Sequence, residues 1–379
     1  MKTITRIMAI AQKEWIHIYR DIRSLILALF APAFLVLIFG YALNMDVKNV
    51  AFIIYDQDTS YFSRQFAQMF MHSEYLTFKG YVATYKDVDS AINSGNAVAA
   101  LVIPHDFTRR LKSGRSSSLQ CILDASDSMS ATIASAYFNA IVTQYNFQWQ
   151  QQQLNKAGFG TIAMPVSIES RVWYNEELLS KNFVVPGIIV IVLAIISALI
   201  TSLAISREWE HGTMESLITT PVRSWEVITG KLIPYIFIGM FDVVITYLVG
   251  YFVFDIPIRG SFTELLLVSI LFLIGTCTFG LVISGATRIQ VLSIQVAMIA
   301  TYLPTILLSG FIFPIKNMPV LLQAITYIIP ARYMIALIKG IALKGLAASL
   351  LSTQIIFMAV FAFIMIIIGM KKINLRYAG

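Results

Sequence analysis

Six long apolar runs constrain the fold of this chain more than any other feature of its sequence. A hydrocarbon core about 30 Å thick is crossed by about 20 helical residues, and each run is close to that length. Each run must be helical, because a lone strand would leave its backbone N–H and C=O groups unpaired in lipid. The sequence therefore predicts an α-helical polytopic membrane protein with six transmembrane helices, at 25–43, 183–205, 232–254, 265–286, 291–313 and 350–370.

The composition agrees with a chain that lies largely in lipid. Hydrophobic residues make up 57% of the chain and charged residues only 13%, whereas soluble domains carry about 25% charged residues. The formal net charge is +7, but the basic residues flank apolar runs and form no basic face interleaved with aromatic residues, so no nucleic-acid partner is expected. The four histidines and two cysteines show neither metal-ligand spacing nor a disulfide framework.

Basic residues near the chain ends predict the orientation. Lysine and arginine are concentrated in residues 1–24 and again in the tail, 371–379, and such residues favour the cytoplasmic side. Both termini are therefore expected in the cytoplasm, which requires an even number of spans. Apolar residues recur at spacings of three and four in 1–24, so we expect an amphipathic helix on the inner membrane surface. The alternative is a solvated lead-in helix.

Two further segments lie on the opposite side in this topology. Residues 314–349 are apolar but interrupted by Pro330, and their pieces are too short to span, so they are expected to form short helices at the outer face. Residues 44–181 are polar enough to be a folded α/β domain outside the membrane. Strands are predicted at 50–55, 97–103, 119–123 and 167–174, and helices near 61–72, 87–94 and 130–154.

The sequence contains no recognisable enzyme site. A phosphate-binding loop needs the pattern G-x-x-x-x-G-K-[ST], and Gly230-Lys231 is followed by Leu232 and has no glycine at position 225. Leu308-Ser309-Gly310 lies within a predicted span, where small residues allow close helix packing. No G-x-S-x-G nucleophile elbow occurs. Any ATP chemistry must therefore come from another chain, and no metal or cofactor is expected here.

The strongest local pattern lies between the second and third spans, in residues 206–231. The second span is expected to continue as a charged helix through Glu210, after which Gly212 lets the backbone turn. Thr213 can cap a new short helix with Glu215 in its first turn. The predicted product is a short helix below the membrane that presents Glu208, Glu210 and Glu215. The alternative is a plain connecting loop.

The run Arg207-Glu208-Trp209-Glu210-His211-Gly212-Thr213-Met214-Glu215-Ser216-Leu217 resembles the signature of ABC-2 type transporter permeases. The resemblance covers nearly the whole chain, including its amphipathic start and the large insert after the first span. Its other matches are Trp173-Tyr174-Asn175, Leu308-Ser309-Gly310 followed by Met318-Pro319, and Pro330-Ala331-Arg332-Tyr333. Asn175-Glu176 departs from the Asn-Pro of many relatives. The layout is closest to bacterial drug-exporter-like inner-membrane permeases with a large periplasmic domain between spans one and two.

This resemblance implies partners and a mechanism. Two permeases, identical or paralogous, pair in the bilayer, and two ABC ATPase subunits that use ATP and Mg bind from the cytoplasm. The implied cargo is a drug or another amphipathic small molecule, and a periplasmic adaptor and an outer-membrane channel are further expected partners. The implied ATPase-coupling residues are Arg207, Glu208, Glu210, Gly212, Thr213 and Glu215. The pathway would run between spans two and five of the two halves, with Ile195, Leu199, Tyr302 and Thr305 as candidates.

Asp242 is the one acidic residue near the middle of a predicted span. A carboxylate there is costly and by default suggests a function, such as holding a cationic substrate or carrying a proton, so it joins the pathway candidates. The alternative is a structural residue that is protonated or hydrogen-bonded near Thr246 or Tyr247, and we favour this structural interpretation.

Two other classes of protein remain as alternatives. An ion-gradient-driven secondary transporter should show internal repeats and several ionisable groups at mid-membrane, but the sequence has one such acid and no clear repeat. A transmembrane sensor with a periplasmic ligand-binding domain usually carries a cytoplasmic output domain, which the short tail after Met370 does not provide.

Overall fold

The computed structural model describes residues 2–43, 49–156, 174 and 179–372. The chain divides into two compact units, one formed by 1–45 with 171–379 and the other by 46–170. Most of the strand predicted at 167–174 and most of the tail at 371–379 lie outside the described residues.

The first unit is helical. Among the described residues, five helices are long and apolar enough to cross a membrane. A bent pair of helices, Val320–Thr326 and Pro330–Leu343 at 78° to each other, would add a sixth if the pair crossed as a single span. The apolar helix α2 has 21 residues, or about 31 Å of length. The principal helices are α1 (Lys2–Arg20), α2 (Ile22–Ala42), α7 (Lys181–Glu210), α9 (Ser224–Phe254), α10 (Phe262–Thr287), α11 (Gln290–Leu308) and α14 (Ser352–Lys372). The chain is thus a predominantly helical, multi-span membrane protein.

Helix α7 forms the centre of this unit. Most of its side chains are buried, and it packs against α2, α9, α10 and α11. Gly280 of α10 shows how closely the helices approach, because a β-carbon at this position would contact the carbonyl oxygen of Ala198 and the hydroxyl of Thr201. Small residues at such crossings let backbones come together where the hydrophobic effect cannot drive association.

Two helix boundaries differ clearly from the sequence prediction. The fifth predicted span, 291–313, ends as a helix at Leu308, and Gly310 has a positive φ of 81°. Phe311 then turns back and contacts Gly187 of α7. Helix α7 continues to Glu210 as predicted, whereas α9 already begins at Ser224 instead of at position 232.

The segment predicted as short outer-face helices contains α12 (Val320–Thr326), α13 (Pro330–Ile338) and a π-helical turn (Lys339–Leu343). Pro330 is the first residue of α13, where a missing N–H costs no helical hydrogen bond. Two cations of this segment lie on aromatic rings: Arg332 lies 4.0 Å from the ring centre of Tyr327, and Lys339 lies 3.4 Å from that of Phe183.

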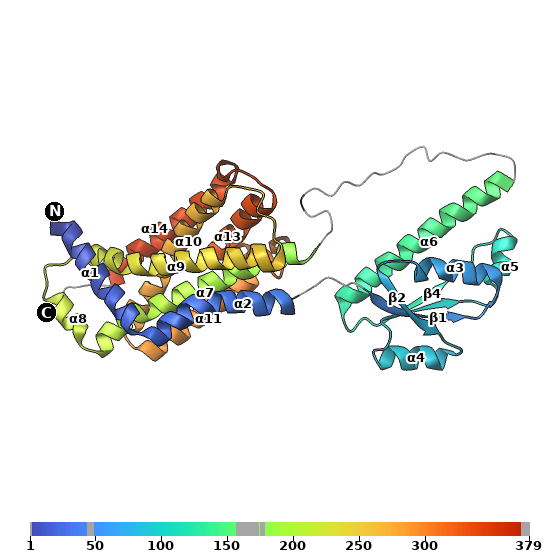
Figure 1. Ribbon diagram of the computed structural model, residues 1–379, viewed down its shortest axis with the longest axis horizontal. Helices are drawn as coiled ribbons and strands as arrows, with labels where there is room; N and C mark the ends of the chain where they lie inside the picture. Colours follow the sequence, from blue (N-terminus) through green and yellow to red (C-terminus); the bar gives the residue numbers. More distant parts are fainter. Residues whose placement is uncertain (1, 44–48, 157–173, 175–178, 373–379) are drawn as a thin grey trace. The chain divides into compact units, whose positions relative to one another are not determined.

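The second unit is a small α/β fold. Its sheet has the order β2-β1-β3-β4, with β1 parallel to β2 and β3, and β4 antiparallel to β3. Strand β2 was missed in the sequence, because its apolar–polar alternation is short and ends at a register shift before Gly80. Helices α3 and α6 cover one face and α4 the other (Figure 1). The elements are β1 (Val50–Asp56), α3 (Tyr61–Met71), β2 (Leu76–Tyr81), α4 (Tyr85–Asn93), β3 (Ala99–Ile103), α5 (Phe107–Lys112), β4 (Gln120–Leu123) and α6 (Ser128–Lys156).

Candidate functional site

A buried cluster of charges joins three helices near the end of α7. The ammonium group of Lys231 on α9 donates to Glu14 Oε2 at 2.7 Å, to Glu208 Oε1 at 3.0 Å and to the carbonyl oxygen of Ala204 at 3.0 Å. Lys13 Nζ donates to the same oxygen of Glu208 at 2.9 Å. The hydroxyl of Tyr235 donates to Glu14 Oε1 at 2.7 Å. We call these five residues the Lys231 network: Lys13, Glu14, Glu208, Lys231 and Tyr235.

The charges of the network sum to zero, and nearly all of its polar side-chain atoms are hydrogen-bonded. Its two lysines balance its two glutamates, and the three donors of Lys231 are all used. Lys231 is only 1% exposed. A buried ion pair of this kind is tolerated only when its partners are in place, and removing one partner leaves an uncompensated charge. The network therefore fixes α1, α7 and α9 to one another.

Glu14 and Lys231 were not predicted as site residues. Glu14 is not among the apolar residues that recur at spacings of three and four in the first helix, yet it is only 5% exposed, because that helix packs against α9 through the side that bears Glu14. Gly230 was the available signal. A β-carbon at Gly230 would lie 2.7 Å from Ile10 Cβ and 3.0 Å from the carbonyl oxygen of Ile7, so the glycine permits the close approach of α1.

Two further ion pairs support the same connection. Arg207 Nη2 lies 3.3 Å from Asp21 Oδ2, at the break between α1 and α2. Arg6 Nη1 lies 3.6 Å from Glu226 Oε2, at the start of α9. The amphipathic first helix is therefore held to α7 and α9 at several points along its length.

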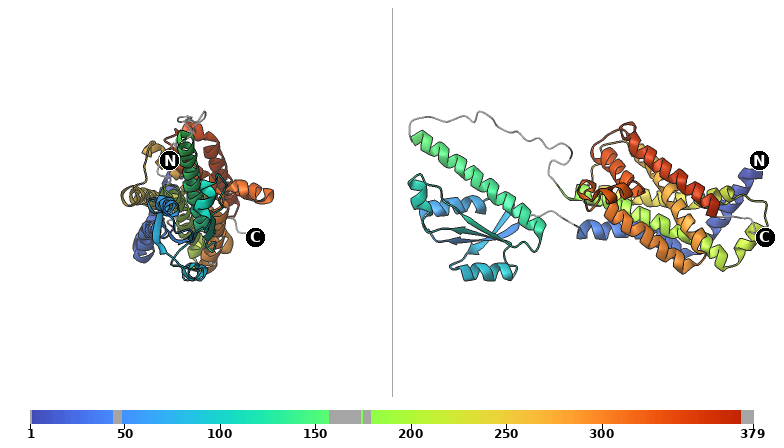
Figure 2. Two further views of the ribbon diagram at one scale, coloured as in Figure 1. Left: turned by 90° about the vertical axis from the view of Figure 1, so that its right-hand side faces the viewer. Right: turned by 180° about the vertical axis from the view of Figure 1, so that it is seen from behind.

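The turn after α7 has the predicted glycine but a different cap. Gly212 adopts a left-handed conformation, with φ of 69°, and α8 (Thr213–Ile218) begins directly after it. The prediction that Thr213 caps this helix is wrong: Thr213 is its first residue, and its hydroxyl donates to the carbonyl oxygen of Glu208 at 3.4 Å. Met214 is buried, whereas Glu215 is exposed in the first turn. Helices α1 and α8 lie at the same end of the unit (Figure 1, Figure 2).

The prediction that this segment presents three glutamates together is wrong. Glu208 is buried in the Lys231 network. Glu210 instead accepts the backbone N–H of Gln290 at 2.8 Å, and its other oxygen accepts the side-chain amide of Gln290. Glu210 thereby satisfies the N-terminus of α11, where a carboxylate is favourable. Glu210 and Glu215 are both exposed, so the prediction fails for Glu208, which the crossing of α1, α7 and α9 buries.

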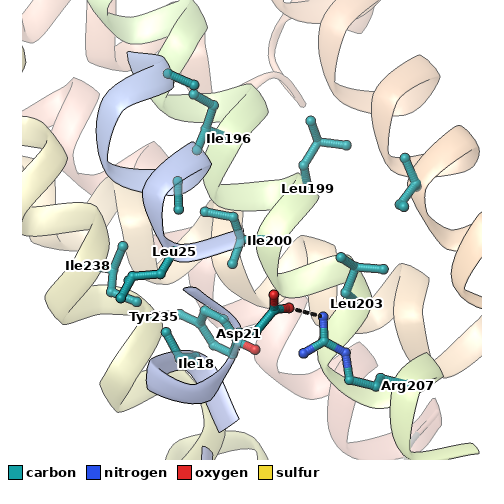
Figure 3. Close-up of a pocket in the computed structure, with 13 residues that line it drawn as sticks. Ile18, Asp21, Leu25, Ile196, Leu199, Ile200, Leu203, Arg207, Tyr235 and Ile238 are labelled. Carbon is teal, nitrogen blue, oxygen red and sulfur yellow. Dashed lines mark hydrogen bonds and ion pairs between the residues drawn. The ribbon is translucent and has the colours of Figure 1, made fainter. Parts of the chain in front are cut away.

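Leu199 is the pathway candidate that lines a cavity. The cavity has a volume of about 230 Å³, and Figure 3 shows it between α2, α7 and α9, with the Asp21–Arg207 pair at one end. Leu203 and Ile238 contribute to its apolar wall. Its other lining residues are Ile18, Leu25, Ala28, Ala31, Ile196, Ile200, Tyr235 and Ile294.

The remaining pathway candidates do not gather at this cavity. Ile195 is partly buried against the apolar core, and Thr305 on α11 is 3% exposed. Tyr302 is 38% exposed. Asp242 is 2% exposed, and its Oδ1 has no hydrogen-bond partner among the residues that the structure describes.

Within the described part of the chain, neither Thr246 nor Tyr247 donates a hydrogen bond to the Asp242 carboxylate, although both were expected as structural partners. The hydroxyl of Thr246 donates to the backbone carbonyl of Asp242 at 2.8 Å, and Tyr247 lies 3.5 Å from Ser269. The hydrogen-bonded alternative is therefore wrong for these two neighbours, and a role of Asp242 in the pathway stays a prediction.

Comparison with known proteins gives a consistent result over nearly the full length. Residues 22–371 match the family model described as ABC-2 family transporter protein. The chain is 34% identical over 360 residues to the probable multidrug ABC transporter permease YbhS of Escherichia coli strain K12, which covers 93% of this chain and 92% of that protein. It is 31% identical over 344 residues to the probable multidrug ABC transporter permease YbhR, covering 89% and 90%.

A more distant relative is the inner membrane transport permease YhhJ of the same organism. The two are 25% identical over 299 residues, covering 77% of this chain and 76% of that protein. Each of these relatives is matched over most of its own length, so the similarity spans both the helical unit and the insert. The chain therefore belongs to the ABC-2 family of transporter proteins.

Proposed function

We propose that this chain is the membrane permease subunit of an ATP-driven exporter, and that a separate ABC ATPase moves it by pushing on α8. The Lys231 network is the observation that carries this proposal. It fixes α1, α7 and α9 to one another beside α8. A displacement of α8 therefore moves the three helices together instead of bending one of them.

The path from α8 to the apolar cavity is short and stiff. Met214 anchors α8 in an apolar cluster with Ile205 and Ile228, and Thr213 bonds to the last turns of α7. From Arg207 to Leu199 the distance along α7 is about 12 Å, at 1.5 Å per residue. Motion at α8 thus reaches the wall of the cavity through one continuous helix.

The partners follow from the same arrangement. The exposed first turn of α8, with Glu215, is the contact for the ATPase, which uses ATP and Mg; this chain binds no cofactor. In this proposal the chain lies in a bacterial inner membrane, with both termini and α8 on the cytoplasmic side. The insert lies in the periplasm, where a periplasmic adaptor and an outer-membrane channel would dock. A second permease, identical or paralogous, would cover the exposed apolar side chains of α11, among them Val291, Met298 and Ile299.

The cargo in this proposal is a drug or another amphipathic small molecule. Two relatives carry the description "probable multidrug ABC transporter permease", and the apolar cavity with an ion pair at one end suits a molecule that has both apolar and polar parts. Leu199, which lines the cavity, is the first candidate for the translocation pathway. The other candidates predicted from the sequence remain Ile195, Asp242, Tyr302 and Thr305.

A charge reversal on α8 tests the proposal. In a strain that expresses the cognate ATPase, we expect Glu215→Arg to abolish co-purification of the ATPase and to stop export, because the acidic contact becomes basic. Glu74→Arg in the insert is the matched control, since Glu74 is also exposed, and it should leave ATPase binding unchanged. Wild-type ATPase binding and export by Glu215→Arg would refute the role of α8.

A further inference from the structure

The chain contains no acidic residue after Glu264. Within this acid-free part, the segment 314–349 carries the cations Lys316, Arg332, Lys339 and Lys344. The segment lies at the end of the helical unit opposite α8, because α13 packs against α7 and Lys339 lies over Phe183 near the start of α7 (Figure 1). In the proposed orientation this end faces the periplasm, where lysine and arginine are normally few. The four cations therefore need a physical explanation.

Three cations gather around the π-helical turn that follows α13. The backbone N–H of Arg259 donates to the carbonyl oxygen of Ala342 at 2.8 Å, so the connection between α9 and α10 lies against this turn. A β-carbon at Gly345 would lie 3.5 Å from Arg259 Cβ. Lys339 begins the turn and Lys344 directly follows it. We call Arg259, Lys339 and Lys344 the basic cluster. A π-helical turn is rare and often lies at a functional site.

The two acidic residues on either side of Arg259 are already engaged. Asp255 Oδ2 lies 3.5 Å from Lys181 Nζ, and Glu264 Oε2 accepts the backbone N–H of Ala348 at 2.8 Å. No carboxylate forms an ion pair with a member of the basic cluster among the residues that the structure describes. The basic cluster therefore carries three positive charges that this part of the chain does not compensate.

The two lysines of the basic cluster lie near aromatic rings instead of acceptors. Lys339 Nζ lies 3.4 Å from the ring centre of Phe183, and Lys344 Nζ lies 5.7 Å from that of Tyr174. A ring face attracts an ammonium group, but it leaves the charge and the three N–H donors of that group available to an anion. Arg259 and Lys344 are exposed, and Lys339 is half-buried. An anion can therefore reach the basic cluster from outside the protein.

The surroundings of the basic cluster favour a lipid as the source of this anion. Three consecutive side chains at the end of α9, Tyr251, Phe252 and Val253, are exposed, and α9 is long and apolar enough to cross a membrane. Arg259 follows this apolar helix end by a few residues. Basic groups beside a membrane-crossing helix bind anionic head groups, and the exposed apolar side chains can contact the acyl chains of the same molecule.

We propose that the basic cluster binds the phosphate of an anionic phospholipid, with Arg259 and Lys344 as its direct contacts and Lys339 as a third charge behind them. The guanidinium of Arg259 can donate to two phosphate oxygens at once, and the ammonium of Lys344 acts as a point charge. The lipid then supplies the counter-ion that the sequence after Glu264 lacks. Only its assignment to the outer leaflet rests on the proposed function.

Photo-crosslinking to the full chain in phosphatidylcholine nanodiscs tests the site without ATP or a partner protein. The probe is phosphatidylglycerol with a diazirine at the start of one acyl chain, and the labelled residues are mapped by mass spectrometry. We expect labels within 251–264 and 339–351. Phosphatidylcholine with the same diazirine should label these residues at least tenfold less, because the choline group cancels the charge of its phosphate.

Two double variants separate the basic cluster from the overall charge of the protein. Arg259→Gln combined with Lys344→Gln should lower the labelling of 251–264 and 339–351 by phosphatidylglycerol at least tenfold. The matched control is Lys79→Gln combined with Arg115→Gln, which removes the same two kinds of charge from exposed positions of the insert. This control should label as wild type.

Two further variants keep the test independent of folding defects. Arg259→Lys combined with Lys344→Arg preserves both charges and should retain the labels. Lys344→Gln alone should lower labelling at least threefold. Lys344 is exposed and its side chain forms no hydrogen bond within the described ranges, so this single change leaves the helix packing intact.

Three results would overturn the proposal. Equal labelling by the phosphatidylcholine probe, or unchanged labelling of the Arg259 and Lys344 variants, would show that apolar contact alone holds the lipid. Loss of the labels in millimolar inorganic phosphate would show a site for a free anion, whereas we expect them to persist. Failure of Glu215→Arg to affect export would refute the coupling proposal and leave these labels unchanged.

Discussion

Replacing Lys231 by methionine removes the central cation of the buried network while keeping most of the side-chain volume. Lys231 donates to two carboxylates and one carbonyl. Without it, the side-chain donors left within the described residues are the hydroxyl of Tyr235 for Glu14 and the ammonium group of Lys13 for Glu208. Breaking a buried ion pair from one side costs about 3–5 kcal/mol, so we expect Lys231→Met to lower the free energy of unfolding by that amount.

Lys181→Met is the matched control. Lys181 pairs with Asp255 at 3.5 Å, but the side chain of Asp255 is 82% exposed and that of Lys181 is 32% exposed. Solvent screens such a pair, and exposed ion pairs contribute about 0–1 kcal/mol. Both variants carry the same substitution at a helix of the same unit, so their difference reports the burial of the charges.

Unfolding in detergent micelles, followed by tryptophan fluorescence during titration with a denaturing detergent, provides the assay. Glu14→Gln combined with Lys231→Met should be less destabilising than the sum of the two single variants, because it removes a charge of each sign from the same network. If Lys231→Met lowers the free energy of unfolding no more than Lys181→Met does, or if the double variant is simply additive, the network does not fix α1 to α9.

Three further predictions follow from the helix crossings, the turn and the proposed orientation. Gly280→Ala forces α7 and α10 apart, because its β-carbon would meet Ala198 and Thr201, and should cost about 1–3 kcal/mol of unfolding free energy; Gly250→Ala, whose β-carbon has no neighbour closer than 3.4 Å, should be nearly neutral in the same titration. Gly212→Ala should cost about 1–2 kcal/mol because φ is 69°, and a normal stability would contradict the left-handed turn. The orientation can be tested with a membrane-impermeant maleimide in a Cys121→Ser background. Ser116→Cys should react in cells whose outer membrane alone is permeabilised, whereas Ser216→Cys should react only after lysis. The reverse pattern would refute the proposed orientation.

The helical unit could be predicted to the extent that lipid alone decides it. Apolar runs of about 20 residues must be helices in a bilayer, so the helices α7, α9, α10, α11 and α14 follow from local composition. Their ends could not be predicted, because they depend on tertiary contacts. The end of α11 at Leu308 instead of position 313 reflects the return of Phe311 onto Gly187.

The α/β insert was predicted in outline and missed in one strand. Strands β1, β3 and β4 are marked by apolar β-branched runs followed by turn residues. Strand β2, Leu76–Tyr81, lies at the edge of the sheet. Its apolar–polar alternation covers only 76–79, because the register shifts before Gly80, and so short a pattern does not identify a strand.

The site was predicted as a segment but not as a set of contacts. The motif around Gly212 and the exposed Glu215 could be read locally, because a glycine turn and a helix start are properties of neighbouring residues. The roles of Glu208 and Glu210 could not, since both are defined by partners on other helices: Lys231 lies 23 residues further along the chain, and Gln290 lies 80 residues further.

The sequence by itself determined that this chain spans a membrane and that its helices carry a turn of ABC-2 type, because hydrophobic length and local turn chemistry act over a few neighbouring residues. Only the tertiary structure decided which charges are buried. Glu14 and Lys231 are separated by 217 positions, and nothing in the residues next to either of them marks the other as its partner. They become partners because α1 packs against α9 at Gly230. Whether a charged side chain is buried depends on how the helices pack, so it cannot be predicted from the sequence of one helix alone.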